Sequence, residues 1–136
     1  MATYPYFNLI DEHGKITKRK EDFERFLKES NAFSEENFFV VSVMGGQSGG
    51  KSTLLNILFE TEFPVLQMGQ RKATTKGVMI SFARNLEKNL IVLDLEGSDS
   101  TEKTESESET FSRKSALFAL AVSEILIVNI WSHDVG

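Results

Sequence analysis

The sequence contains no cysteine, no excess of basic charge and no hydrophobic run long enough to cross a bilayer. Without cysteine, disulfides and thiolate metal sites are excluded, which is compatible with a reducing compartment. The formal net charge of −5 argues against a surface that holds nucleic acid by phosphate neutralisation alone. The longest apolar stretch, residues 125–131, is far shorter than the ~20 residues of a membrane-spanning helix.

The length of 136 residues and a hydrophobic content of 40% suffice for one domain with one core. Residues 2–6 lack the basic flank and apolar core of a signal peptide. We find no internal repeat, and the one compositionally biased segment covers residues 98–110.

The central feature is a glycine-rich segment that follows a short apolar run, Phe38–Met44. That run is β-branched and aromatic, which is typical of a buried parallel strand. The segment matches the phosphate-loop pattern G-x-x-x-x-G-K-[ST]. Its residues are Gly45, Gly46, Gln47, Ser48, Gly49, Gly50, Lys51 and Ser52, and Thr53 completes the expected nucleotide-binding set.

Each constrained position of this loop has a physical role. The glycines allow backbone conformations that gather N–H groups around an anion. Lys51 is expected to reach the terminal phosphates, and the Ser52 hydroxyl to ligate Mg²⁺. Leucine and isoleucine at helical spacing over residues 54–58 predict a helix whose positive end points into the phosphate site. The alternative, a glycine-rich turn without ligand, is disfavoured by this strand–loop–helix context.

Before the loop, Phe7–Ile10 is expected to form a short strand that enters a turn at residues 11–15. His13 lies in that turn with no second ligand nearby, so we interpret it as a solvated turn residue. Phe23, Phe26 and Leu27 mark one face of a charged helix that ends near residue 30 and should pack on the edge of the core.

Residues 61–76 lack periodicity and are interpreted as a loop, and loops of ~15 residues inside a compact domain are usually functional. The loop leads into a predicted strand, Val78–Phe82. Thr74 and Thr75 precede that strand, where a nucleotide-sensing loop would touch magnesium. The alternative is that the threonines merely start the strand.

A second buried strand, Leu90–Leu93, runs into a D-x-x-G sequence. Asp94 is then placed to hold magnesium through a water, and the Gly97 amide to sense the terminal phosphate. D-x-x-G alone is a weak motif. Directly after an apolar strand and downstream of a phosphate loop it is strong.

Residues 96–109 carry six carboxylates and one lysine, so this stretch cannot be core. We favour a mobile switch that responds to nucleotide over an ordinary solvated loop. Beyond it, residues 111–122 predict a helix and Ile125–Trp131 a strand. His133 and Asp134 could pair with each other, but phosphoryl transfer needs neither.

With these motifs in place, the sequence resembles dynamin-superfamily GTPases of the atlastin and root-hair-defective type, which fuse endoplasmic reticulum membranes. The resemblance is closest to the latter branch and covers about Phe38 to the end. It is carried by GGQSGGKSTLLNILF, TTKGV, LDLEGSD and SALFALAVSEILIVNIWSHDVG. The last string is the most specific, because a phosphate loop alone is shared with many ATPases.

The resemblance implies that Thr75 is the switch threonine and a magnesium ligand, and that Asp94 and Gly97 form the second switch. Gln47 and Ser48 fall where dynamin-like enzymes steady the transition state. Atlastin has an arginine at the position of Ser48. The group that neutralises developing charge between the β- and γ-phosphates is therefore open.

The expected fold is an α/β P-loop NTPase with a mainly parallel sheet flanked by helices and Val78–Phe82 antiparallel at one edge. We expect residues 1–136 to be the N-terminal part of a GTPase domain, lacking the positions that recognise guanine and the family's helical bundle and membrane anchor. Residues 125–131 would then be an exposed apolar edge.

The expected reaction is GTP hydrolysis with Mg²⁺, in a parent protein on the cytoplasmic face of the endoplasmic reticulum that forms a nucleotide-dependent homodimer and binds no nucleic acid. GTP is implied by the resemblance, since the phosphate loop would accept ATP equally well. Two alternatives stay open: a nucleotide-gated dimerisation module with incidental hydrolysis, and an ATPase of unrelated role.

Overall fold

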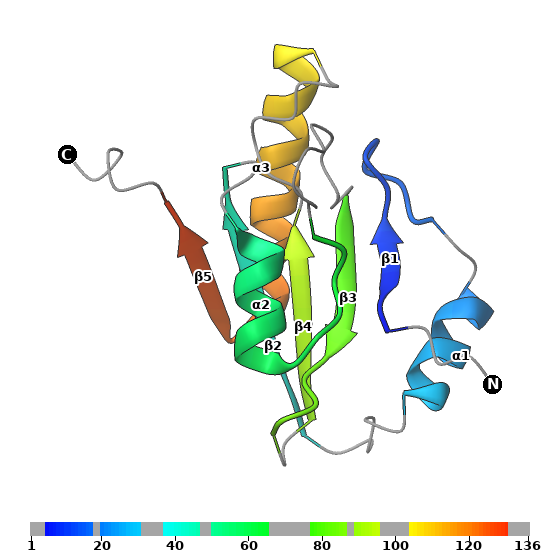
Figure 1. Ribbon diagram of the computed structural model, residues 1–136. Coiled ribbons are helices and arrows are strands. Elements are labelled where there is room, and N and C mark those ends of the chain that lie inside the picture. The colour runs from blue at the N-terminus through cyan, green and yellow to red at the C-terminus, as the bar shows by residue number, and fades with distance from the viewer. Residues whose placement is uncertain are drawn as a thin grey trace.

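The computed structural model describes residues 5–17, 20–30, 37–46, 50–65, 77–86, 89–95 and 104–130. Within them, three helices accompany a single five-stranded sheet (Figure 1). The strands are β1 (Phe7–Ile10), β2 (Phe38–Gly45), β3 (Val78–Phe82), β4 (Asn89–Leu95) and β5 (Ile125–Asn129), and the helices are α1 (Lys20–Glu29), α2 (Lys51–Phe59) and α3 (Glu105–Val122).

The sheet has the order β1-β3-β4-β2-β5 and is mixed. β2 is parallel to both β4 and β5, while β3 is antiparallel to both β4 and β1. The antiparallel direction predicted for β3 is confirmed, but its predicted edge position is wrong. All five residues of β3 are buried, as in an internal strand, and the shorter, half-buried β1 forms the edge instead.

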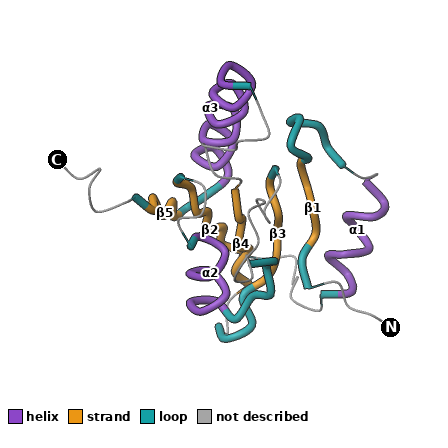
Figure 2. The backbone as a smooth tube through the Cα atoms, turned by 45° about the horizontal axis from the view of Figure 1, so that its top comes forward, coloured by secondary structure: helices purple, strands orange, loops and turns teal. Residues whose placement is uncertain are grey.

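Alternate residues of the strands supply two hydrophobic clusters, one on each face of the sheet. Leu55 of α2 packs with Val41, Val43 and Val92 on one face. The other face carries Ala119 of α3 against the opposite residues of the same strands. Figure 2 accordingly shows α2 and α3 on opposite sides of the sheet. β2 and β4 therefore lie at the centre, covered on both faces.

The helix predicted around Phe23 and Phe26 is confirmed as α1, and it packs beside β1 (Figure 1). The ring of Phe26 lies 5.3 Å from that of Phe7 and 5.6 Å from that of Phe82. This aromatic contact joins α1 to both antiparallel strands at the end of the sheet.

The parallel strand predicted from Phe38 onward is confirmed, but its first residues are not buried. Phe38 and Phe39 are 45% and 43% exposed, and burial begins at Val40. The register explains this difference. Phe38 pairs with Asn89, the first residue of β4, so these aromatic side chains lie at the end of the sheet.

Helix α3 begins at Glu105, earlier than the residue 111 expected from the sequence. The mobile switch or solvated loop predicted for residues 96–109 is therefore wrong for residues 105–109, while residues 96–103 lie outside the described part. Thr104 forms a capping box with Glu107. Acidic residues occupy the first turn, where their negative charge interacts favourably with the positive end of the helix dipole. An exposed first turn of a helix needs no apolar residues, so the acidic composition of this segment did not distinguish a helix from a loop.

β5 ends at Asn129, so the predicted strand is shorter than expected, and Trp131 lies outside the described residues. The expected exposed apolar edge is confirmed. Ile125 and Val128 are 59% and 56% exposed, and β5 has β2 on one side and no strand of the described chain on the other. Of the predicted loop at 61–76, residues 61–65 are described and contain neither helix nor strand. No described helix has the length and apolar character required to cross a membrane.

Candidate functional site

The carboxyl ends of three parallel strands meet at one edge of the sheet, and helix α2 begins there. In the register of β2 with its neighbours, Val43 lies opposite Asp94 of β4, and Gly45 lies opposite Asn129 of β5. Ligands of open α/β sheets bind in the crevice outside such strand ends. The sequence-predicted residues Lys51 and Asp94 are therefore brought to the same edge.

Two loop glycines occupy conformations that disfavour other residues. Gly45 has φ 151°, and a Cβ built there would lie 2.0 Å from the carbonyl oxygen of Asn129. Gly50 has φ 76° at the N-cap of α2, and no atom of the described residues lies within 4 Å of a Cβ built there. The first position needs glycine for space as well as conformation, and the second for its backbone conformation alone.

Lys51 is the first residue of α2, and only 6% of its surface is exposed. Its Nζ donates a hydrogen bond to the carbonyl oxygen of Gly46 at 2.7 Å, so the side chain folds back along the loop. No acidic residue lies in the first turn of α2, and Gly50 offers no side-chain cap. The positive end of the helix therefore faces the loop without a competing carboxylate of its own.

Ser52 and Asp94 form the second half of the site. The Ser52 hydroxyl donates to Oδ2 of Asp94 at 2.5 Å, and Asp94 is fully buried. A hydroxyl beside a carboxylate is a set of hard oxygen donors, which suits Mg²⁺. The described residues contain no group of three or more acidic, histidine or cysteine side chains that could hold a metal ion. A magnesium ion here would therefore take most of its ligands from phosphate and water, as this ion commonly does.

Several predicted site residues lie outside the described part, namely Gln47, Ser48, Gly49, Thr75 and Gly97, and their roles stay predictions. His133 and Asp134 lie outside it as well. Thr53 is an exposed residue of α2, beside the two residues predicted to contact phosphate and metal.

The prediction that His13 is a turn residue is confirmed. Its backbone N–H and that of Lys15 each donate to Oδ1 of Asp11 at 2.9 Å. The hydrogen bond from Lys15, followed by that from His13, holds the pKa of the Asp11 carboxyl below its usual range. This charged turn follows β1, and no described contact joins it to the residues of the phosphate site.

Three sets of polar contacts next to the site were not predicted from the sequence. The side chain of Asn56 in α2 forms hydrogen bonds with the segment that follows the helix. The sequence hints at this role only by placing a polar amide among the apolar residues of α2. Ser42 of β2 lies 2.5 Å from Ser123, oxygen to oxygen, and Glu124 accepts from the backbone N–H of Val40 at 2.6 Å. These last contacts fix the junction of α3 and β5 to the strand that leads into the phosphate loop.

Comparison with known proteins agrees with this geometry. The chain is 42% identical to Protein SEY1 of Komagataella phaffii over 94% of its length, 53% identical to Protein sey1 of Neurospora crassa over 92%, and 43% identical to Protein SEY1 homolog 1 of Entamoeba histolytica over 98%. It spans 18%, 15% and 14% of those relatives, respectively.

The same region carries a family match. Residues 44–136, more than half of the chain, match the family described as Root hair defective 3 GTP-binding protein (RHD3) GTPase domain. The resemblance inferred from the motifs is thereby confirmed. The chain belongs to the RHD3 GTPase domain family, and its phosphate loop, α2 and Asp94 are parts of that domain.

Proposed function

We propose that this chain supplies the phosphate- and magnesium-binding part of a GTPase that hydrolyses the γ-phosphate of GTP. The observation that carries the proposal is the meeting of Lys51, Ser52 and Asp94 at the carboxyl edge of the sheet, with Ser52 and Asp94 in direct contact. Family membership supports guanine as the base.

In this proposal, Lys51 leaves the Gly46 carbonyl to contact the terminal phosphate oxygens, since charge-assisted bonds to phosphate are stronger than bonds to a neutral carbonyl. Ser52 would ligate the metal directly and Asp94 through a water. A magnesium ion held there would supply positive charge that offsets the negative charge developing on the phosphate. The protein thus contributes positioning and electrostatic stabilisation to in-line attack by water.

The remaining roles of the site rest on the sequence. Thr75 would close on the metal when the γ-phosphate is present, and the Gly97 amide would contact that phosphate. Gln47 and Ser48 would steady the transition state, although Ser48 cannot supply the positive charge of an arginine. The roles of these residues extend the proposal beyond the described contacts.

For the whole protein, we propose a dynamin-like GTPase that drives homotypic fusion of endoplasmic reticulum membranes from their cytoplasmic face. The resemblance of its motifs to the atlastin and root-hair-defective GTPases implies this role, and membership of the RHD3 GTPase domain family agrees with that resemblance. Membrane attachment and a helical bundle would come from parts of the protein outside residues 1–136, and GTP would promote a homodimer. A nucleotide-gated dimerisation module and an unrelated ATPase are the alternatives.

Replacement of Lys51 tests the assignment of the phosphate site. Lys51→Ala removes the mobile cation while the glycine backbone keeps its shape. Charge-assisted hydrogen bonds are worth about 1.5–3 kcal/mol, so we expect GTP affinity to fall by roughly tenfold to a hundredfold in the full-length protein. Calorimetric titration measures this loss, and unchanged affinity would remove Lys51 from the site.

The alternatives are separated by following dimer mass during titration with GTP and with a non-hydrolysable analogue. Association that needs only nucleotide binding supports the module. Turnover that rises with protein concentration supports a dimer-activated enzyme, and equal affinity for ATP and GTP supports the ATPase.

A further inference from the structure

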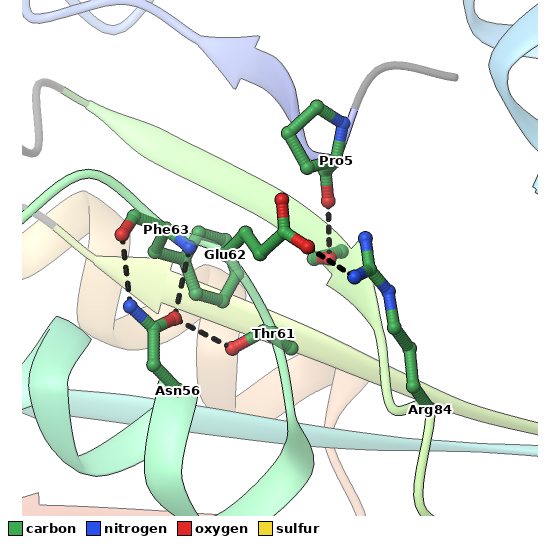
Figure 3. Close-up of polar contacts among 7 residues, drawn as sticks. Pro5, Asn56, Thr61, Glu62, Phe63 and Arg84 are labelled. Carbon is green, nitrogen blue, oxygen red and sulfur yellow. Dashed lines mark hydrogen bonds and ion pairs between the residues drawn. The ribbon is translucent and has the colours of Figure 1, made fainter. Parts of the chain in front are cut away.

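Helix α2 carries a further polar side chain, Asn56, which lies five residues after Lys51 and seven residues before Phe63, in the last turn of the helix. The side-chain amide of Asn56 bonds both backbone groups of Phe63. Its Nδ2 donates to the Phe63 carbonyl at 2.9 Å, and its Oδ1 accepts from the Phe63 N–H at 2.8 Å (Figure 3). The amide therefore substitutes for the strand partner that this irregular segment lacks.

The same oxygen of Asn56 also accepts from the hydroxyl of Thr61 at 2.9 Å. Thr61 and Phe63 are 5% and 2% exposed, so the two residues that Asn56 contacts are buried, and Asn56 itself is partly buried. The ring of Phe63 belongs to the hydrophobic cluster that contains Leu55 on the α2 face of the sheet. Backbone groups at this depth need partners, and Asn56 supplies them. We call Asn56, Thr61 and Phe63 the amide clamp.

Contacts on the outer side of the segment hold it against the turn between β3 and β4. Glu62 forms an ion pair with Arg84, and the backbone N–H of Arg84 donates to the carbonyl of Phe59 at 3.0 Å. Both charged side chains are about half exposed, so the ion pair contributes little. The buried amide clamp is the stronger restraint.

The position of the clamp connects it to the chemistry. The same helix carries Lys51 and Ser52 at its start and, through Asn56 in its last turn, forms hydrogen bonds with the backbone of Phe63. The described segment continues to residue 65, and the sequence beyond it leads to Thr75, the predicted switch threonine, which lies outside the described residues. We propose that Asn56 is a positioning residue for GTP hydrolysis, which fixes the departure of the connecting segment to the same rigid helix that holds the phosphate and metal ligands. This inference rests on the proposed function.

Displacing a positioned group by about 1 Å can lower the rate of an enzymatic step a hundredfold, whereas ground-state contacts made by Lys51 and Ser52 do not depend on Phe63. Loss of the clamp should therefore affect the turnover of bound GTP more than the affinity for GDP. A purely structural role would instead lower stability and leave turnover per folded molecule unchanged.

The test uses Asn56→Asp in the full-length protein. Aspartate keeps the acceptor for Thr61 and for the Phe63 N–H, but faces the Phe63 carbonyl with a carboxylate instead of a donor. We expect single-turnover hydrolysis of bound GTP to fall by about tenfold or more, with GDP affinity within about twofold of wild type. Thr61→Val, which removes the hydroxyl that donates to Asn56, should lower hydrolysis less than Asn56→Asp does. Thr61→Ser keeps this hydroxyl and should hydrolyse bound GTP at close to the wild-type rate.

Asn85→Ala is the matched control, because Asn85 donates to the carbonyl of Leu58 at the same end of α2 at 2.9 Å without touching the clamp. Two results overturn the inference. Either Asn56→Asp and Thr61→Val hydrolyse bound GTP at the rate of Asn85→Ala, or hydrolysis and GDP affinity fall together in proportion to the folded fraction. If Asn56→Asp does not fold, Thr61→Val against Thr61→Ser decides. A wild-type protein that does not hydrolyse GTP would instead refute the proposed function, independently of Asn56.

Discussion

Gly45 and Gly50 bracket the phosphate loop, and both have positive φ, yet the surroundings of the two residues differ. A side chain at Gly45 would meet the backbone of β5, whereas a side chain at Gly50 would enter open space. The pair therefore separates the two reasons for which a phosphate loop uses glycine. One is close approach of neighbouring backbone, and the other is conformational freedom.

We predict that Gly45→Ala destabilises the protein more than Gly50→Ala. Gly50→Ala should cost about 1–2 kcal/mol, the usual penalty for a left-handed residue with a Cβ. Gly45→Ala must in addition move β5 away from β2, and we expect a loss of at least about 3 kcal/mol. Equilibrium urea unfolding measures both free energies of unfolding. Equal losses would show that the contact with Asn129 is relieved without cost.

At the scale of elements, the start of α3 is set by side chains and not by the core. The Thr104 hydroxyl accepts from the Glu107 N–H, and Glu107 reaches back to the Thr104 N–H. The first two turns are mostly exposed. This terminus therefore depends on its cap more than on packing.

We predict that Thr104→Ala lowers the free energy of unfolding by about 1 kcal/mol, while Thr104→Ser leaves it nearly unchanged. Thr110→Ala is the matched control, since Thr110 is an exposed threonine in the body of α3, where alanine favours the helix. Urea unfolding and hydrogen exchange at residues 105–108 provide the measurements. A Thr104→Ala protein as stable as Thr110→Ala would contradict the capping role.

The elements that the sequence predicts well are those with local signals. β2 and α2 follow from one contiguous motif, and β4 follows from its apolar run before Asp94. The edge position of β1 and the early start of α3 were missed. Strand order depends on long-range pairing, and the capping box was hidden in an acidic segment whose composition suggested a loop.

The candidate site shows the same division. Contact between Ser52 and Asp94 could be anticipated, because Ser52 follows β2 and Asp94 lies at the carboxyl end of β4, and these strand ends meet at one edge of the sheet. The amide clamp could not, because Asn56 bonds backbone groups of an irregular segment that has no periodic pattern. Sequence motifs identified the groups proposed to contact the ligand, and the structure was needed to find Asn56, which we propose as a positioning residue.

At the scale of the whole molecule, four strands point toward the phosphate edge and β3 alone runs the other way. β5, whose outer edge is exposed and apolar in the described part of the chain, lies beside β2, and the last residue of β2 is the first glycine of the phosphate-loop motif. Anything that packs on β5 would therefore lie within one strand of the nucleotide site. In the relatives the matched region is less than a fifth of the protein.

Phosphate release by the full-length protein tests the central claim most directly, with GTP and ATP compared in the presence and absence of Mg²⁺. The account predicts magnesium-dependent release that is faster with GTP than with ATP, and a reduction of at least about tenfold in Ser52→Ala, which loses the direct metal ligand. Equal release from both nucleotides, or a Ser52→Ala protein as active as wild type, would contradict it.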